Sequence, residues 1–199
     1  MTEFFFGMVG GSLIEWVAVV CGLINVTLII RRSIWNYPFG FVMVTLYFFI
    51  FWDFKLYSDA LLQVYFFVIQ IYGLWIWVRG RAEDGRIRIA PLKRQTFALY
   101  LGITAAAWIA ISWLMATYTD AAAPRWDAAV AALSVTAQFL TSRRHLESWL
   151  LWIAVDVLAI GLFYTRDLMP TAALYTVFLG LAILGYLQWR NAQKDVVAR

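Results

Sequence analysis

The chain has 199 residues, of which 63% are hydrophobic, 18% are aromatic and only 14% are charged, and its formal net charge is +4. Soluble domains are closer to half apolar and a quarter charged, so this composition excludes an ordinary soluble domain and indicates a membrane protein. A single cysteine and a single histidine exclude a disulfide framework and a multi-histidine metal site.

Three segments carry no charged residue over 19, 24 and 19 positions, and they are residues 60–78, 96–119 and 171–189. Nineteen helical residues span about 28 Å, which matches the hydrocarbon core of a bilayer. Four shorter segments can also cross with some tilt, and they are residues 16–30, 39–52, 128–141 and 149–163. The sequence therefore predicts an all-α integral membrane protein with seven transmembrane helices.

The basic residues alternate between the loops that join these spans. The loops on one side and the C-terminal tail hold 13 of the 16 lysines and arginines, and the opposite loops hold only Lys55, Arg125 and Arg166. The positive-inside rule then places the N-terminus outside and the C-terminus in the cytoplasm. This loop bias also accounts for the net charge, so we expect no nucleic-acid partner.

The second half of the chain matches the first when the two arginine pairs are aligned. Arg31–Arg32 then meets Arg143–Arg144, and the same register pairs Gly73 with Gly185 and Trp77 with Trp189. Both halves also begin outside and end inside by the charge pattern. The sequence thus predicts two parallel three-helix units joined by a linker helix, a 3+1+3 plan that occurs in transporters with a site between the halves.

This plan divides one transmembrane domain, residues 1–199, into four parts. The first three-helix unit covers residues 12–78, and residues 79–126 hold a cytoplasmic loop, the linker helix and an outer loop. The second unit covers residues 127–190, and residues 191–199 form a cytoplasmic tail.

The motif WNYPFG opens the second span. Pro38 lacks an N–H and Gly40 tolerates unusual dihedral angles, so we expect the helix to start or break there. Tyr37 is either an interfacial anchor or a site residue, and Trp35 beside Asn36 favours the site.

Two amides share one face of the third span. Gln63, Phe67 and Gln70 are spaced i, i+4 and i+7, and an amide in hydrocarbon needs a partner. Helix–helix hydrogen bonding is one explanation, and a polar pathway is the one we favour. Toward the cytoplasmic end Trp77 fits an interfacial aromatic belt, whereas Tyr72 remains a site candidate.

The segment ESWLLWIAVDV places a carboxylate among large aromatic side chains. Trp149, Trp152 and Asp156 are spaced i, i+3 and i+7 on one helical face. Gln138 in the fifth span is a further amide within the membrane, like the two amides of the third span. Trp149 also fits an interfacial belt. A carboxylate inside the membrane is a functional-site candidate unless it has a structural partner.

Several kinds of chemistry have no machinery in this sequence. It holds no GxxxxGK[ST] motif, no HExxH, no paired cysteines and no evident Ser–His–Asp set. We therefore expect neither an enzyme nor a nucleotide-driven pump, and neither a cofactor nor a metal. A passive carrier fits these absences.

These motifs resemble the PnuC family of bacterial nicotinamide riboside transporters, within the wider Pnu group of vitamin transporters. The similar pieces are WNYPFG, LYSDALLQVYF, IYGLWIW, SRRHLESWLLWIAVDV and TAALYTVFLGLAILGYLQW. The resemblance implies a fold similar to the SWEET sugar transporters, a homotrimer and a location in the bacterial inner membrane. It also implies facilitated diffusion, in which a cytoplasmic kinase phosphorylates the nucleoside and prevents its return.

The resemblance implies binding roles at the matching positions. They are Trp35, Asn36, Gln63, Tyr72, Gln138, Trp149, Trp152 and Asp156. Two departures are visible, because this group often has Asn-Trp where the chain has Ser148–Trp149, and some members have asparagine where it has Asp156.

The pyridinium ring of nicotinamide riboside carries a permanent positive charge. Trp149 or Trp152 suits a cation–π contact with it, and Asp156 suits its neutralisation or hydrogen bonds from the ribose. Thiamine, also cationic, is the first rival substrate, and neutral riboflavin is the second. A membrane scaffold, in which the aromatic residues are belts and Asp156 bonds a neighbouring helix, remains an alternative of another class.

Overall fold

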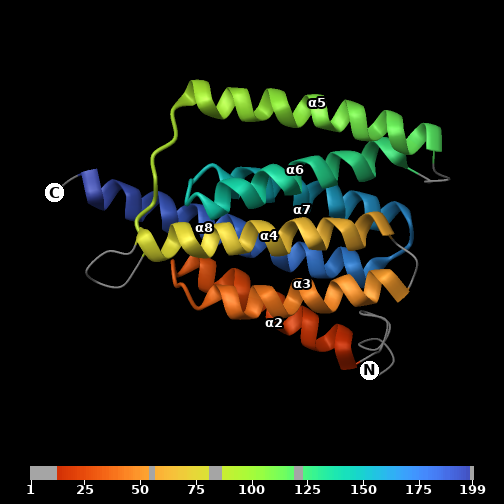
Figure 1. The fold of residues 1–199 in the computed structure, drawn as a ribbon, viewed down its shortest axis with the longest axis horizontal. Coiled ribbons are helices and arrows are strands. Elements are labelled where there is room, and N and C mark those ends of the chain that lie inside the picture. Colours follow the sequence, from red (N-terminus) through yellow and green to blue (C-terminus); the bar gives the residue numbers. More distant parts are fainter. Residues whose placement is uncertain (1–12, 54–56, 81–86, 119–122, 198–199) are drawn as a thin grey trace.

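The computed structural model describes residues 13–53, 57–80, 87–118 and 123–197. Within these ranges the chain forms seven α-helices, labelled as in Figure 1. They are α2 (Leu13–Ile30), α3 (Asn36–Asp53), α4 (Tyr57–Arg79), α5 (Arg94–Tyr118), α6 (Pro124–Ser142), α7 (Ser148–Thr165) and α8 (Met169–Val197). Each predicted span lies within one of them, apart from residue 119, which is outside the described ranges.

Five of the helices, α2, α4, α5, α7 and α8, are long and apolar enough to cross a membrane. The other two do not reach this limit: α3 has Asn36 and Asp53 at its ends, and α6 has Arg125 and Asp127 near its start. Helix α3 begins at Asn36 and continues through Pro38, which a first helical turn tolerates because its N–H groups have no intrahelical acceptor.

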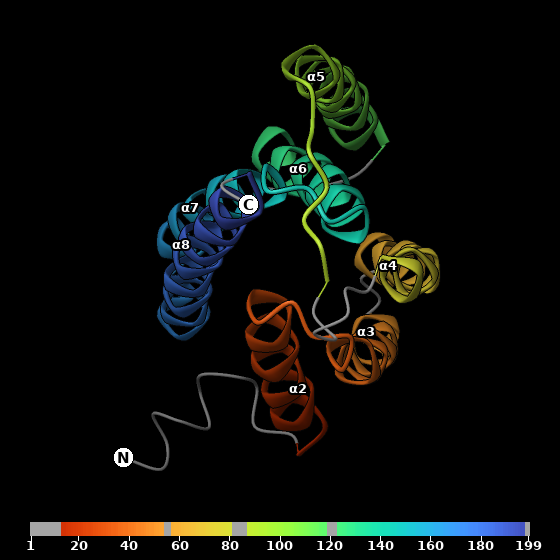
Figure 2. The same cartoon turned by 90° about the vertical axis from the view of Figure 1, so that its left-hand side faces the viewer.

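Six helices form a closed ring, seen end-on in Figure 2. Along the chain α2 packs on α3, α3 on α4, α6 on α7 and α7 on α8, and the contacts of α4 with α6 and of α2 with α8 close the ring. Helix α5 lies outside it and packs only on α6 among the described helices.

Two helix–helix turns, α2–α3 and α6–α7, occupy matching places in the repeat and have the same internal bonding. The first is closed by Ser33 N–H to Leu28 O (2.9 Å) and Asn36 Nδ2 to Ser33 O (2.7 Å), and the second by His145 N–H to Leu140 O (3.0 Å) and Ser148 Oγ to His145 O (2.8 Å). Both turns hold an arginine in the left-handed region, Arg32 at φ 56° and Arg144 at φ 66°. An ordinary L-residue there costs about 1–2 kcal/mol, so the sequence repeat is also a repeat of local structure.

Two tryptophans link the halves reciprocally. Trp77 at the end of α4 donates its Nε1–H to Thr141 O in the second turn region, at 3.3 Å. Trp189 on α8 donates to Ile29 O at 3.2 Å and to Ile30 O at 3.3 Å in the first. Both indoles are 1% exposed, and their ring centroids lie 6.2 Å apart. Each half therefore donates an indole N–H to the end of the other half's first helix, where Ile29 O and Thr141 O also accept the N–H groups of Arg32 and Arg144 within their own turns.

Residues 87–93, which lead into α5, cross both turns, and Figure 2 shows them running over this end of the ring. Ile87 N–H bonds Arg32 O at 3.2 Å, and Ala90 N–H bonds Arg144 O at 2.9 Å. Burial lowers the pKa of the His145 imidazole, which is therefore neutral at pH 7, and its Nδ1–H donates to Ala90 O at 3.1 Å. We call this end of the ring the turn end.

Replacing Trp189 with phenylalanine tests the link between the halves. We expect Trp189→Phe to lower the stability by about 1–3 kcal/mol, because Ile30 O loses its indole donor and Ile29 O keeps only the N–H of Arg32. Thermal unfolding in detergent measures the change. Trp113→Phe, at a position 60% exposed on α5, is the matched control and should leave the midpoint unchanged. Equal midpoints for both variants would contradict a stabilising role for the indole.

Candidate functional site

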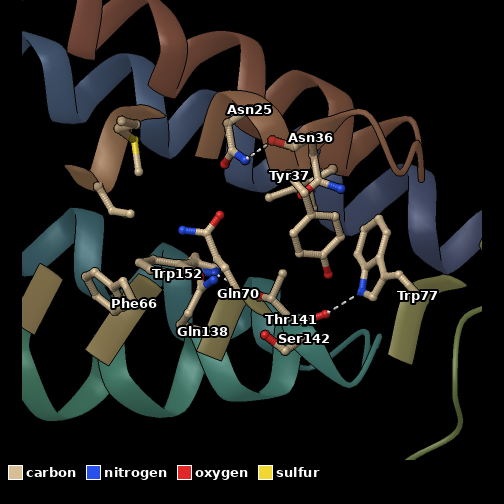
Figure 3. A pocket seen from close by; sticks show the side chains of 13 residues that line it. Asn25, Asn36, Tyr37, Phe66, Gln70, Trp77, Gln138, Thr141, Ser142 and Trp152 are labelled. Atoms are coloured by element: carbon tan, nitrogen blue, oxygen red, sulfur yellow. Dashed lines mark hydrogen bonds between the residues drawn. The ribbon is translucent and has the colours of Figure 1, made fainter. Parts of the chain in front are cut away.

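The ring of helices encloses a cavity of about 70 Å³. Five of the six ring helices line it, and Figure 3 shows the side chains that face it. Those with hydrogen-bonding groups are Asn25, Asn36, Tyr37, Gln70, Trp77, Gln138, Thr141, Ser142 and Trp152. The volume is far below the roughly 300–1,000 Å³ of a pocket for a drug-sized molecule. The described conformation is therefore closed, and an organic ligand enters only when lining side chains or helices move.

Amide groups line the cavity from several helices. Gln70 is 4% exposed, and its Oε1 is buried without a hydrogen-bond partner among the described residues. Nearby, Asn25 Nδ2 donates to Asn36 O at 2.8 Å. An unpaired buried acceptor costs about 1–3 kcal/mol, so Gln70 is poised to accept a hydrogen bond from a ligand.

Gly40 makes room for these amides. A Cβ at this position would lie 2.7 Å from Asn25 Nδ2 and closer still to Gln70 Oε1. The sequence predicts that a helix starts or breaks at this motif, and α3 does begin within it, at Asn36, and continues through Gly40. Its role here is the absence of a side chain, which lets two polar groups meet the helix backbone.

Aromatic rings line the cavity beside the amides. Trp152 donates its Nε1–H to Thr141 Oγ1 at 3.1 Å, and the Thr141 hydroxyl donates to Ala137 O at 2.9 Å. Toward the turn end, Tyr37 meets Trp77 edge-on, with ring centroids 5.5 Å apart and an interplanar angle of 89°. The cavity can thus offer an aromatic ring to a flat group and amides to hydrogen-bonding groups.

The structure brings four of the residues predicted for the site to this cavity, which are Asn36, Gln70, Gln138 and Trp152. They come from four different helices of the ring, α3, α4, α6 and α7. In Figure 3 the side chains of Gln70, Gln138 and Trp152 lie opposite Asn25 and Asn36.

Three other predicted residues do not line the cavity. Trp35 is 68% exposed, and Phe67 is 39% exposed with its ring 5.1 Å from that of Phe41. Tyr72 stacks on Phe139, with ring centroids 6.3 Å apart. Outward-facing aromatic side chains at these positions suit a lipid-facing surface.

The last three predicted residues are buried in the ring but lie outside the cavity lining, and they are Gln63, Trp149 and Asp156. Trp149 packs edge-on against Trp189 at 5.6 Å, and its Nε1 lacks a hydrogen-bond partner among the described residues. Asp156 is 5% exposed, forms no ion pair within the described part of the chain, and lies within electrostatic range of Tyr175 on α8.

Sequence reasoning missed several lining residues. The assignment of Trp77 to an interfacial belt is wrong, because the side chain is 1% exposed and lies at the cavity. Its alignment with Trp189 in the repeat was the available signal. Asn25 was also missed, although a lone amide in an apolar span points to a buried partner. Thr141 and Ser142 gave no signal, since small hydroxyl groups also bond within their own helix.

The family model described as "Nicotinamide mononucleotide transporter" matches residues 12–191. The nicotinamide riboside transporter PnuC of Escherichia coli K12 is 27% identical over 92% of this chain and 87% of its own length. PnuC of Neisseria mucosa is 29% identical over 89% of this chain and 72% of its own. The riboflavin/roseoflavin transporter RibM of Streptomyces davaonensis is 24% identical, over 88% and 83%.

A solved structure agrees with these sequences. The crystal structure of the vitamin B3 transporter PnuC superposes with a TM-score of 0.79 at 26% identity and covers 96% of this chain and 86% of the other. These relatives are membrane transporters rather than enzymes. Because the family model covers nearly the whole sequence, this chain belongs to the nicotinamide mononucleotide transporter family, and within it is a PnuC-type multi-pass membrane transporter.

Proposed function

We propose that this protein carries nicotinamide riboside across the bacterial inner membrane and binds it in the cavity between the two groups of helices. The observation that carries the proposal is the buried Gln70 Oε1, an acceptor without a partner among the described residues, at a cavity that Trp152 also lines. A ribose hydroxyl or a carboxamide N–H would satisfy it. The family and its nicotinamide riboside transporters support this choice of substrate.

The chemical groups of nicotinamide riboside match the two kinds of side chain that line the cavity, aromatic rings and amides. Its cationic pyridinium suits the face of Trp152, where a cation–π contact contributes about 0.5–2 kcal/mol. Its ribose and carboxamide suit the amides of Asn36, Gln70 and Gln138, which offer both donors and acceptors.

Asp156 and Gln63 extend this site away from the turn end. Asp156 follows Trp152 by four residues on α7, and Gln63 precedes Gln70 by seven on α4, which runs in the opposite sense. We propose that they meet the cationic substrate on its outward route, with Trp149 supporting the ring of helices behind it. Trp35, Phe67 and Tyr72 would contact the substrate only in another conformation.

The transport mechanism we propose is facilitated diffusion by alternating access between two three-helix units. The repeated turns and the position of α5 outside the ring support a 3+1+3 plan. With the N-terminus outside, the turn end faces the cytoplasm, where a kinase would phosphorylate the nucleoside and prevent its return. A homotrimer belongs to the same proposal.

Calorimetric titration of the purified protein with nicotinamide riboside, thiamine and riboflavin tests the substrate. We expect nicotinamide riboside alone to bind tightly, and Trp152→Ala to weaken it because the ring face is lost. Asp156→Asn should weaken it as well and should spare the fold. Riboflavin is a serious competitor because RibM is a relative. Binding of riboflavin or thiamine instead would overturn the proposed substrate. If none of the three binds detectably to a folded sample, the proposed site is overturned.

Replacing Gln70 with leucine separates binding from packing. Because the variant removes an unpaired buried acceptor, we expect it to be at least as stable as the parent protein, and more stable by up to about 1–3 kcal/mol. The same variant should bind nicotinamide riboside about tenfold more weakly, since the ligand loses its acceptor. Thermal unfolding and calorimetry measure the two effects. A variant that is destabilised and binds normally would assign Gln70 a structural role.

Proteoliposomes test the driving force. Uptake of labelled nicotinamide riboside should stop at equal concentrations inside and out, whether or not a proton or sodium gradient is present. An enclosed nucleoside kinase with ATP should then raise the trapped label well above the external level, because the phosphorylated product cannot return. Accumulation that needs an ion gradient would instead indicate coupled transport.

A further inference from the structure

We infer that Thr141 is a positioning residue, whose hydroxyl sets the orientation of the Trp152 ring at the binding cavity. The inference rests on the proposed function, because it assigns to the Trp152 ring the contact with the flat group of the substrate. Thr141 lies in the last turn of α6, is 5% exposed and lines the cavity.

The direction of both hydrogen bonds follows from the donors available. The Thr141 hydroxyl donates its proton to Ala137 O at 2.9 Å, one turn earlier in α6. Its oxygen lone pairs are then directed away from that carbonyl and accept the Nε1–H of Trp152 at 3.1 Å. An indole has one donor, so this bond fixes which way the ring is turned about its side-chain torsions.

A second indole meets the same residue through its backbone. Trp77 donates its Nε1–H to the carbonyl oxygen of Thr141 at 3.3 Å. Both indoles line the cavity, one from α4 and one from α7. The two contacts can be tested separately, because a substitution of the Thr141 side chain removes the acceptor for Trp152 and keeps the backbone acceptor for Trp77.

The internal repeat distinguishes positioning from a general structural need. The counterpart of Thr141 in the first half is Ile29, and its carbonyl accepts the indole of Trp189 in the same way. The architecture therefore requires a carbonyl at this position and no hydroxyl. The counterpart of Trp152 is Gly40, so the first half has no ring at the matching position, and the hydroxyl–indole pair occurs there only in the second half.

The test uses Thr141→Val, which keeps the side-chain shape and removes the hydroxyl. We expect it to bind nicotinamide riboside about tenfold more weakly in calorimetry, and Thr141→Ser to restore the affinity. Thr27→Val is the matched control, because the Thr27 hydroxyl bonds Leu23 O in its own helix, as Thr141 bonds Ala137 O, and lies outside the cavity lining. This control should bind like the parent protein.

Indole N–H signals in ¹H–¹⁵N NMR spectra supply a readout that needs no substrate. Trp152→Phe and Trp77→Phe assign the two signals. We expect the Trp152 proton to move upfield in Thr141→Val and to return in Thr141→Ser, while the Trp77 signal keeps its position.

Each outcome decides the inference. An unmoved Trp152 signal in Thr141→Val overturns it, and so does a moved signal with unchanged affinity. If the parent protein does not bind nicotinamide riboside, the proposed substrate fails, and the NMR spectra still decide whether the hydroxyl orients the ring.

Discussion

The exchange of tryptophan hydrogen bonds between the two halves is the interaction on which the closed ring depends. The last carbonyls of a helix lack partners within it, and at buried helix ends the protein itself must supply the donors. Here Thr141 O accepts from Arg144 N–H and Trp77, and Ile29 O accepts from Arg32 N–H and Trp189. Because the two indoles also pack together, the two turns are held at the same end of the ring, and the cavity is closed there.

The two halves share the same turns and backbone contacts, but they differ in the side chains that line the cavity. The turns, the left-handed arginines and the tryptophan contacts all recur at matching positions of the two halves. At the cavity, however, Gly40 is the counterpart of Trp152, so one half leaves space, occupied by Asn25 and Gln70, where the other places an aromatic ring. In the mechanism we propose, this difference lets the site hold a ligand with a flat cationic end and a hydrogen-bonding end in a single orientation. The symmetric frame would then allow one half to move against the other while the asymmetric lining recognises the ligand.

The helices and the repeat could be predicted from the sequence because uncharged runs and arginine pairs mark their ends directly. The direction in which individual aromatic side chains point could not be predicted from the sequence. Trp35 and Tyr37 are close neighbours in the sequence, and which of them points inward depends on the turn that leads into α3. Trp77 has the position of an interfacial tryptophan, and only its contact with the opposite half, far away in the sequence, makes it a core residue. Long-range packing of this kind overrides local pattern.

In the mechanism we propose, the unpaired polar groups inside the ring affect how easily the substrate-free protein passes through the closed state. Gln70 Oε1 and Trp149 Nε1 are buried without hydrogen-bond partners among the described residues, and each such group costs the empty closed state about 1–3 kcal/mol. A substrate that satisfies Gln70 stabilises the closed state relative to the empty one. In the mechanism we propose, a penalty of this size slows the return of the empty carrier without preventing it. Several more unpaired groups in the cavity would make return depend on a bound substrate and would convert a uniporter into an exchanger.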